Sequence, residues 1–245
     1  MSKSNKPAKD HNTFKQGILD GIPIALGYLS VSFSFGILAV TSGLSAWQAV
    51  LISFFNLTSA GQVAGLSIMT ASGGFIEMAV SQIVINLRYS LMAISLSQKT
   101  DESVNIPARF ILAHGITDEI FGVSAGSDHP VGRRYQLGLM ILPILGWTTG
   151  TLIGGILGSV FPDFLANALA IGIYGMFISI VVPRAKHSRS VLICVLIACA
   201  LSSLFYFEPH LAGTVSGGFA TIISAVIAAG IGCAFFPSDA KEEAQ

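Results

Sequence analysis

Apolar residues recur along this chain in runs of about 20, separated by short polar stretches. A helix of that length matches the hydrocarbon core of a bilayer, and alternation typical of strands is not found in the sequence. Because a backbone in lipid must satisfy its own hydrogen bonds, each run predicts a helix. We predict an all-α fold with about eight transmembrane helices, at residues 17–40, 47–70, 77–97, 108–126, 135–160, 164–182, 190–207 and 211–236.

The loops between these runs are short, so we expect one membrane domain over residues 17–236. A basic tail (1–16) precedes it and a short tail (237–245) follows it. Composition agrees, because hydrophobic residues make up 52% of the chain, charged residues 11%, and the mean hydropathy is +0.72. Soluble domains have about 25% charged residues, so this composition excludes a soluble globule.

Basic residues predict the orientation in the membrane. They gather before the first run, between the fourth and fifth, and between the sixth and seventh, at Lys3, Lys6, Lys9, Lys15, Arg133, Arg134, Arg184, Lys186 and Arg189. These clusters share one side if residues 108–126 cross the bilayer. In that case both termini are cytoplasmic and Thr100 is external. A re-entrant hairpin elsewhere would restore the same parity, so about seven full crossings remain the alternative.

The fourth run contains the sequence HGITDEIFGV, with ionisable residues near its centre. Each costs roughly 2.5–3.5 kcal/mol at mid-membrane and therefore needs a partner or an aqueous cavity. His114 and Asp118 are spaced i, i+4 and are expected on one helix face. We predict that Arg88 pairs with Asp118 and that Glu119 is the proton carrier in a polar cavity. The alternative is a pair that only fixes helix packing. No metal site is expected, because further ligands are not evident.

A second polar island, NLTSAGQVAG at residues 56–65, lies in the middle of the second run and predicts a broken helix. Broken helices in transporters expose helix ends that hold zwitterionic ligands. The alternative is an intact helix whose small residues pack closely. Asp20 precedes Pro23 and lines the inner mouth or caps the interface. The predicted substrate-binding residues are Asn56, Thr58, Ser59, Gly61, Gln62, Asn86 and Arg88.

Glycines follow one another at i, i+4 spacing in the fifth run, at Gly146, Gly150, Gly154 and Gly158. Such a stripe of small residues favours close helix packing. The stretches LGYLSVSFSFGILAV and LGWTTGTLIGGILGS, in the first and fifth runs, align without gaps. This match suggests two parallel repeats of four helices each.

The sequence lacks the motifs of several functional classes. The chain has no G-x-S-x-G, H-E-x-x-H or P-loop pattern, so we expect neither an enzyme nor an ATP-driven pump, and no cofactor. Energy would come from a gradient or from a separate subunit. A non-transporting scaffold or assembly subunit is the alternative, although it would not need three titratable groups at one depth.

The ordered motifs DGIPIALGY, TSAGQ, NLRYSL, TDEIFGV and GWTTGT, over about residues 17–183, resemble the AzlC (azaleucine-resistance) family of branched-chain amino acid exporters. The resemblance implies export of leucine, isoleucine, valine or related amino acids across a bacterial plasma membrane. It also implies a small AzlD-type membrane subunit as partner. We expect no contact with nucleic acid. The second run departs from the frequent family sequence A-G-A-S-Q-F and keeps only Ala60 and Gln62. Tyr89 replaces a frequent histidine.

Overall fold

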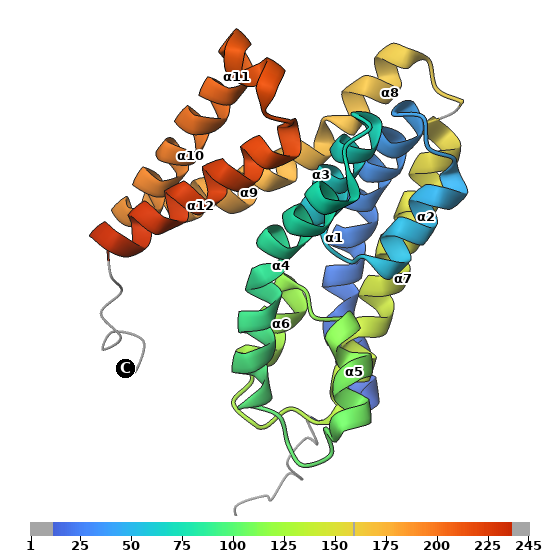
Figure 1. Cartoon of the computed structure of the whole chain (residues 1–245). Coiled ribbons are helices and arrows are strands. Elements are labelled where there is room, and N and C mark those ends of the chain that lie inside the picture. Colours follow the sequence, from blue (N-terminus) through green and yellow to red (C-terminus); the bar gives the residue numbers. More distant parts are fainter. Residues whose placement is uncertain (1–11, 159, 237–245) are drawn as a thin grey trace, which may run out of the picture.

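The computed structural model describes residues 12–158 and 160–236, and every named element in this part of the chain is a helix (Figure 1). The helices are α1 (Phe14–Thr41), α2 (Ala46–Phe55), α3 (Ser59–Thr70), α4 (Phe75–Ser97), α5 (Ile106–His114), α6 (Asp118–Ala125), α7 (Arg133–Gly158), α8 (Asp163–Ala170), α9 (Gly172–His187), α10 (Arg189–Phe207), α11 (Pro209–Thr214) and α12 (Gly217–Phe235).

Among the described residues, five helices are long and apolar enough to cross a membrane: α1, α4, α7, α10 and α12. Between them lie three pairs of shorter helices, α2–α3, α5–α6 and α8–α9, and the single short helix α11. The chain is therefore a polytopic helical membrane protein. The predicted number of about eight crossings is larger than the number of long helices, because three of the predicted crossings, at 47–70, 108–126 and 164–182, are pairs of shorter helices.

Helices α1 and α7 lie side by side over their whole length and run in the same direction (Figure 1). Near their first turns, a Cβ built on Gly17 would lie 2.1 Å from the carbonyl oxygen of Tyr135. Near their last turns, a Cβ on Gly154 would lie 2.0 Å from the carbonyl oxygen of Phe33. The two backbones touch, and only glycine permits this distance.

The glycines of the predicted stripe, Gly146, Gly150, Gly154 and Gly158, all face α1. A Cβ on any of the first three would come within 2.5 Å of a backbone carbonyl oxygen of α1, and one on Gly158 would lie 3.0 Å from Ile37 Cα. The stripe therefore defines the contact surface of α7. It carries no polar side chain and places no chemistry there.

The fourth apolar run does not cross the membrane, which corrects the prediction for residues 108–126. Thr100, after α4, forms a parallel bridge with Val131, before α7, and the Val131 amide donates to the Lys99 carbonyl at 2.9 Å. The segment between them therefore leaves and returns at one end of the bundle. Its helices α5 and α6 are separated by residues 115–117 and form a re-entrant hairpin (Figure 1).

The second apolar run is also a re-entrant hairpin. Its helix is broken as predicted, because α2 ends at Phe55 and α3 begins at Ser59. It does not cross either. Helix α1 starts at the end where α4 finishes, so the segment between them starts and ends at the opposite end. Hydropathy alone cannot distinguish a crossing from a reversal, because both helices of the hairpin are apolar.

We call the end of the bundle that holds the starts of α1 and α7 the basic end. Its basic residues are Lys15, Lys99, Arg109, Arg133 and Arg134, whereas the loops 42–45 and 71–74 at the opposite end carry no charged residue. Thr100 therefore lies at the same end as Lys15 and Arg133, and the expectation that it lies on the other side from them is wrong. Asn12 ties the loops of this end together through Asp101 and Gly132. Hydrogen bonds from Ser103 and Asn12 hold the pKa of Asp101 below its usual value.

The order of helices supports an internal duplication. A long helix, an interrupted pair, a long helix and a second pair follow one another twice, from α1 to α6 and from α7 to α12. Helix α2 packs on α7, and its counterpart α8 packs on α1. Tyr28 and Trp147, which occupy equivalent places in the aligned stretches, contact each other edge to face with ring centroids 5.2 Å apart. The parallel direction of α1 and α7 agrees with parallel repeats.

The re-entrant hairpins predict which positions share a side of the membrane. In a background lacking Cys194, Cys199 and Cys233, single cysteines at Lys15, Thr100 and Ser127 should react with an impermeant maleimide from one side. A cysteine at Ala71 should react from the other side. The comparison uses right-side-out and inside-out vesicles. Labelling of Thr100→Cys from the same side as Ala71→Cys would contradict the α5–α6 hairpin.

The glycine contact predicts a large difference between two identical substitutions. Gly154→Ala should lower the stability of the folded protein by about 1–3 kcal/mol, because the added methyl group meets the backbone of α1. Gly27→Ala should be neutral or slightly stabilising, because no atom lies within 4 Å of its Cβ position and alanine favours helix. Thermal unfolding in detergent micelles measures both. Equal unfolding temperatures would show that α1 and α7 are not in close contact.

Candidate functional site

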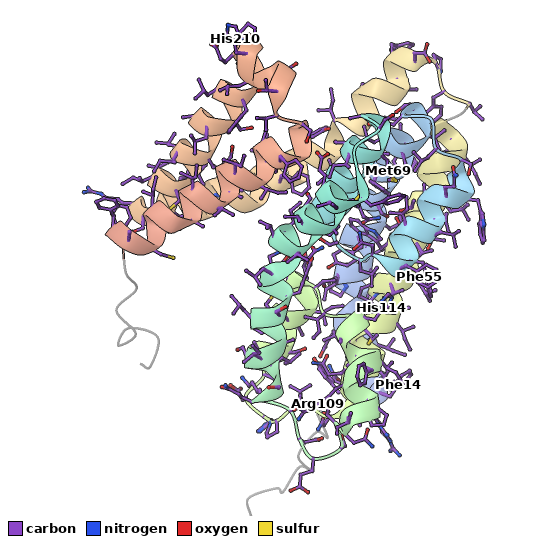
Figure 2. All side chains as sticks on the ribbon, in the orientation of Figure 1. Phe14, Phe55, Met69, Arg109, His114 and His210 are labelled. Atoms are coloured by element: carbon purple, nitrogen blue, oxygen red, sulfur yellow. The ribbon has the colours of Figure 1, made fainter. Side chains whose placement is uncertain are left out.

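The tips of the two re-entrant hairpins meet midway between the ends of the bundle. The ring of Phe54, in the last turn of α2, lies 5.9 Å from the ring of His114, the last residue of α5. Figure 2 shows this meeting: Phe55 and His114 lie at one level, with Phe14 and Arg109 on one side of them and Met69 on the other. Two chain interruptions with polar backbone groups therefore come together inside the apolar bundle.

A cavity of about 190 Å³ lies between these tips. It is smaller than the roughly 300–1,000 Å³ of pockets for drug-sized ligands, so it suits a small solute. Its polar walls come from both hairpins and from α1 and α4. Its apolar walls come from the break between α2 and α3 and from α3, α4, α7 and α9. The lining residues that matter here are Tyr28, Ser59, Arg88, Asp118, Glu119 and Phe177.

The ion pair predicted between Arg88 and Asp118 is present on one wall of the cavity. Nη1 of Arg88 lies 2.8 Å from Oδ2 and 3.0 Å from Oδ1 of Asp118. The guanidinium carbon also lies 5.0 Å from the ring centre of Tyr89, at cation–π distance. The side chains are 41% and 34% exposed. The pair therefore belongs to the surface of the cavity and is not sealed in the protein.

Glu119 is held by a different partner. The hydroxyl of Tyr28 donates a short hydrogen bond to Glu119 Oε2 and lies 2.6 Å from Thr117 Oγ1. Thr117 also caps α6 by accepting from the amide of Ile120. Among the described residues, no cationic side chain is paired with Glu119. The two adjacent carboxylates of α6 thus differ: one is neutralised by an arginine and the other is not.

Gln62 lies behind the cavity wall, which differs from its predicted role as a substrate ligand. It is 1% exposed and accepts from the Trp147 indole nitrogen at 2.9 Å. Its own amide nitrogen donates to Ser53 at 2.9 Å, and Ser53 is 2.7 Å from Thr151. Gln62 therefore fixes the position of Trp147, whose ring supports Tyr28 at the cavity.

The other predicted substrate residues also divide into those that line the cavity and those that have a structural role outside it. Ser59 lines the cavity, whereas Asn56 ends α2 and the buried Thr58 caps α3. The carbonyl of Gly61 accepts from Gln82, which in turn accepts from Asn86. Gly61 and Asn86 therefore connect the α2–α3 hairpin with α4 through Gln82, and Asn56 and Thr58 lie at the break between α2 and α3. None of the four lines the cavity.

The expected position of His114 and Asp118 on one face of a single helix is wrong, because residues 115–117 separate α5 from α6. His114 contacts Phe54 and does not line the cavity. Asp20 also lies elsewhere, between α1 and α7, where it accepts from Tyr135 at 2.7 Å and from Gln16 at 2.8 Å. No group of side chains suited to a metal ion is found in the described part of the chain.

Aromatic residues were the part of the site that the sequence patterns did not assign. Tyr28, Tyr89 and Trp147 contact the charged groups or each other, and Phe177 and Val181 from α9 close the apolar side. The one available signal was the aligned LG-aromatic motif of the first and fifth runs. It marks the two positions where the helix pair meets at the cavity.

A helical membrane protein in which interrupted helices surround a charged cavity at mid-depth has the architecture of a solute transporter. The chain belongs to the AzlC family: the family model described as AzlC protein matches residues 23–161, from α1 through α7. The resemblance drawn from the motifs is thereby confirmed. The matched residues include both hairpins and every charged residue of the cavity.

Relatives from several organisms support this assignment. An uncharacterized membrane protein of Archaeoglobus fulgidus is 31% identical over 183 residues, covering 72% of this chain and 79% of the relative. The inner membrane protein YgaZ of Escherichia coli is 25% identical over 91% of this chain and 96% of its own length. The branched-chain amino acid transport protein AzlC of Bacillus subtilis is 24% identical, with 69% and 70% covered. No solved structure matches.

The ion pair predicts energetic coupling between Arg88 and Asp118. Arg88→Ala and Asp118→Ala should each destabilise the protein, and the double variant should be more stable than the sum predicts by about 0.5–3 kcal/mol. The loss should stay below the roughly 3–5 kcal/mol of a fully buried pair, because the cavity hydrates the remaining charge. Thermal unfolding of the four proteins gives the coupling. Arg134→Ala combined with Asp118→Ala is the control, and strict additivity for Arg88 would argue against the pair.

Proposed function

We propose that this chain is the large subunit of a secondary-type exporter of branched-chain or related amino acids, with its basic end in the cytoplasm. The observation that carries the proposal is the cavity between the hairpin tips, which combines opposite charges with an apolar wall. The Bacillus subtilis relative named as a branched-chain amino acid transport protein supports the substrate class. The basic end supports the orientation, because cytoplasmic loops of membrane proteins are enriched in lysine and arginine.

The cavity offers separate places for the parts of an amino acid. Helix α3 begins at Ser59 without an acidic residue in its first turn, so its amide groups and Arg88 can bind a carboxylate. The unpaired carboxylate of Glu119 can bind the ammonium group. Leu57, Ile85 and Phe177 form an apolar wall for an aliphatic side chain.

Proton coupling is assigned to Glu119. Asp118 is paired with Arg88, whereas Glu119 has a hydroxyl as its described partner and is the carboxylate of the cavity that is left to exchange a proton. A proton on Glu119 and an ammonium group next to it exclude each other. This exclusion would exchange an incoming proton for an outgoing amino acid, so a proton gradient would drive export.

The competing function is a scaffold or assembly subunit without transport. The small AzlD-type subunit is part of the proposal as well, and α10, which has no buried residue, leaves a long helix available for such a partner. Flux through purified protein, with and without the small subunit, separates these cases. A scaffold would carry no amino acid in either condition.

The proposed role of Glu119 predicts that Glu119→Gln loses the coupling between leucine transport and the pH gradient. In proteoliposomes, wild-type protein should move radiolabelled leucine faster when a pH gradient is imposed. At saturating leucine, Glu119→Gln should still exchange leucine, although a higher leucine concentration is needed because the ammonium group loses its carboxylate partner. It should lose the response to the gradient, because the carboxyl that carries the proton is gone. Glu102→Gln, a change in an exposed loop at the basic end, is the control. Full gradient dependence in Glu119→Gln would assign coupling to another group, and absence of leucine flux in wild type would refute the proposed function.

A further inference from the structure

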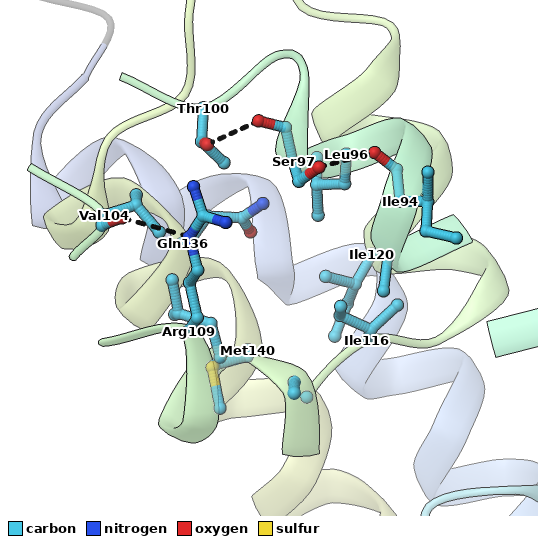
Figure 3. A pocket seen from close by; sticks show the side chains of 14 residues that line it. Ile94, Leu96, Ser97, Thr100, Val104, Arg109, Ile116, Ile120, Gln136 and Met140 are labelled. Atoms are coloured by element: carbon cyan, nitrogen blue, oxygen red, sulfur yellow. Dashed lines mark hydrogen bonds between the residues drawn. The ribbon is translucent and has the colours of Figure 1, made fainter. Parts of the chain in front are cut away.

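A second, larger cavity of about 330 Å³ lies on the basic-end side of the α5–α6 hairpin, between this hairpin, α4 and α7 (Figure 3). Its walls are mostly aliphatic, with Ile94, Leu112, Ile116, Ile120 and Met140 among them. It shares no lining residue with the cavity between the hairpin tips. The hairpin separates the two: Gly115 and Ile116 line the second cavity and Thr117 begins the first.

The polar side chains of this second cavity form a donor group at one end. Figure 3 shows the guanidinium of Arg109 next to the amide of Gln136, with the aliphatic side chains below them. Arg109 makes one long hydrogen bond, 3.4 Å from Nε to the Val104 carbonyl. Its terminal nitrogens have no hydrogen-bond partner among the described residues. Gln136 is 3% exposed and accepts from Ser124 through Oε1, and its amide nitrogen has no described partner.

The charge of this cavity is positive. None of its described lining residues is acidic, so Arg109 is not neutralised within the cavity. A ligand carboxylate can bind the guanidinium with two parallel hydrogen bonds and take a third from the Gln136 amide. A ligand ammonium group would find no carboxylate here. In this respect the second cavity differs from the first, where Asp118 and Glu119 provide negative charge.

We propose that this cavity is a binding site for aliphatic monocarboxylates of about five to seven carbons, with the carboxylate on Arg109 and Gln136 and the alkyl group against Ile116, Ile120 and Met140. The cavity volume of about 330 Å³ limits the length of the alkyl group. The site does not depend on the proposed transport function. A bound ligand contacts the tip of the hairpin whose other side lines the first cavity.

Binding of 4-methylpentanoate to the full chain in nanodiscs tests the site, with empty nanodiscs subtracting partition into lipid. Calorimetry should show saturable binding to wild type. Arg109→Gln should weaken it by about tenfold or more, because a charge-assisted hydrogen bond is lost. Arg109→Lys should restore part of it. Gln136→Glu should weaken binding through like charge, and Arg134→Gln, at the same end of the bundle, should bind as wild type.

Ligands that differ from 4-methylpentanoate in one feature show which chemical group the second cavity recognises. The uncharged 4-methylpentanamide and the zwitterion leucine should bind at this site at least about tenfold more weakly than the carboxylate. Equal binding of the amide, or unchanged binding by Arg109→Gln, would overturn the site. Saturable binding only of long-chain fatty acids would assign the cavity to lipid. Loss of 4-methylpentanoate binding in Arg88→Gln, with Arg109→Gln unaffected, would place the ligand in the first cavity. Leucine flux reports on the transport proposal separately.

Discussion

The contact between α1 and α7 is the constraint on which the other helices depend. Lipid gives no hydrophobic reward for bringing apolar helices together, so close backbone packing through small residues has to hold them. Glycines on both helices provide it, as Gly17 and Gly154 show at opposite ends. Helix α2 then packs on α7 and α8 on α1, and Tyr28 meets Trp147 at the centre. The cavity is thus attached to the most closely packed part of the bundle.

The sequence predicted the helical class, the membrane location and the break after Phe55, because hydropathy and polar clusters are local signals. It did not predict reversal of the chain. A run such as 108–126 is apolar enough to cross, and Gly115 to Thr117 contain no proline to mark a break. The sequence Thr117-Asp118-Glu119 does have the pattern of a helix start, an N-cap followed by acidic residues. That signal was interpreted as buried charge.

For the site, charge was easier to predict than position. The sequence offered few candidate partners for Arg88, and Asp118 is its partner in the structure. Both residues lie near the middle, Arg88 on α4 and Asp118 at the hairpin tip. Gln62, Thr58 and Gly61 were assigned to ligand because polar residues in lipid need partners, but other protein groups satisfy that need.

The short lengths of α5 and α6 have a consequence for how the protein is made. Helices of 9 and 8 residues are too short to be held by a bilayer that requires about 20. The hairpin is instead fixed by contacts with α7, as between Ser124 and Gln136. Helix α7 follows the hairpin in the chain and is synthesised after it. The cavity between the hairpin tips therefore forms only after α7 has been inserted. The α5–α6 hairpin enters the membrane before the helix that holds it in place.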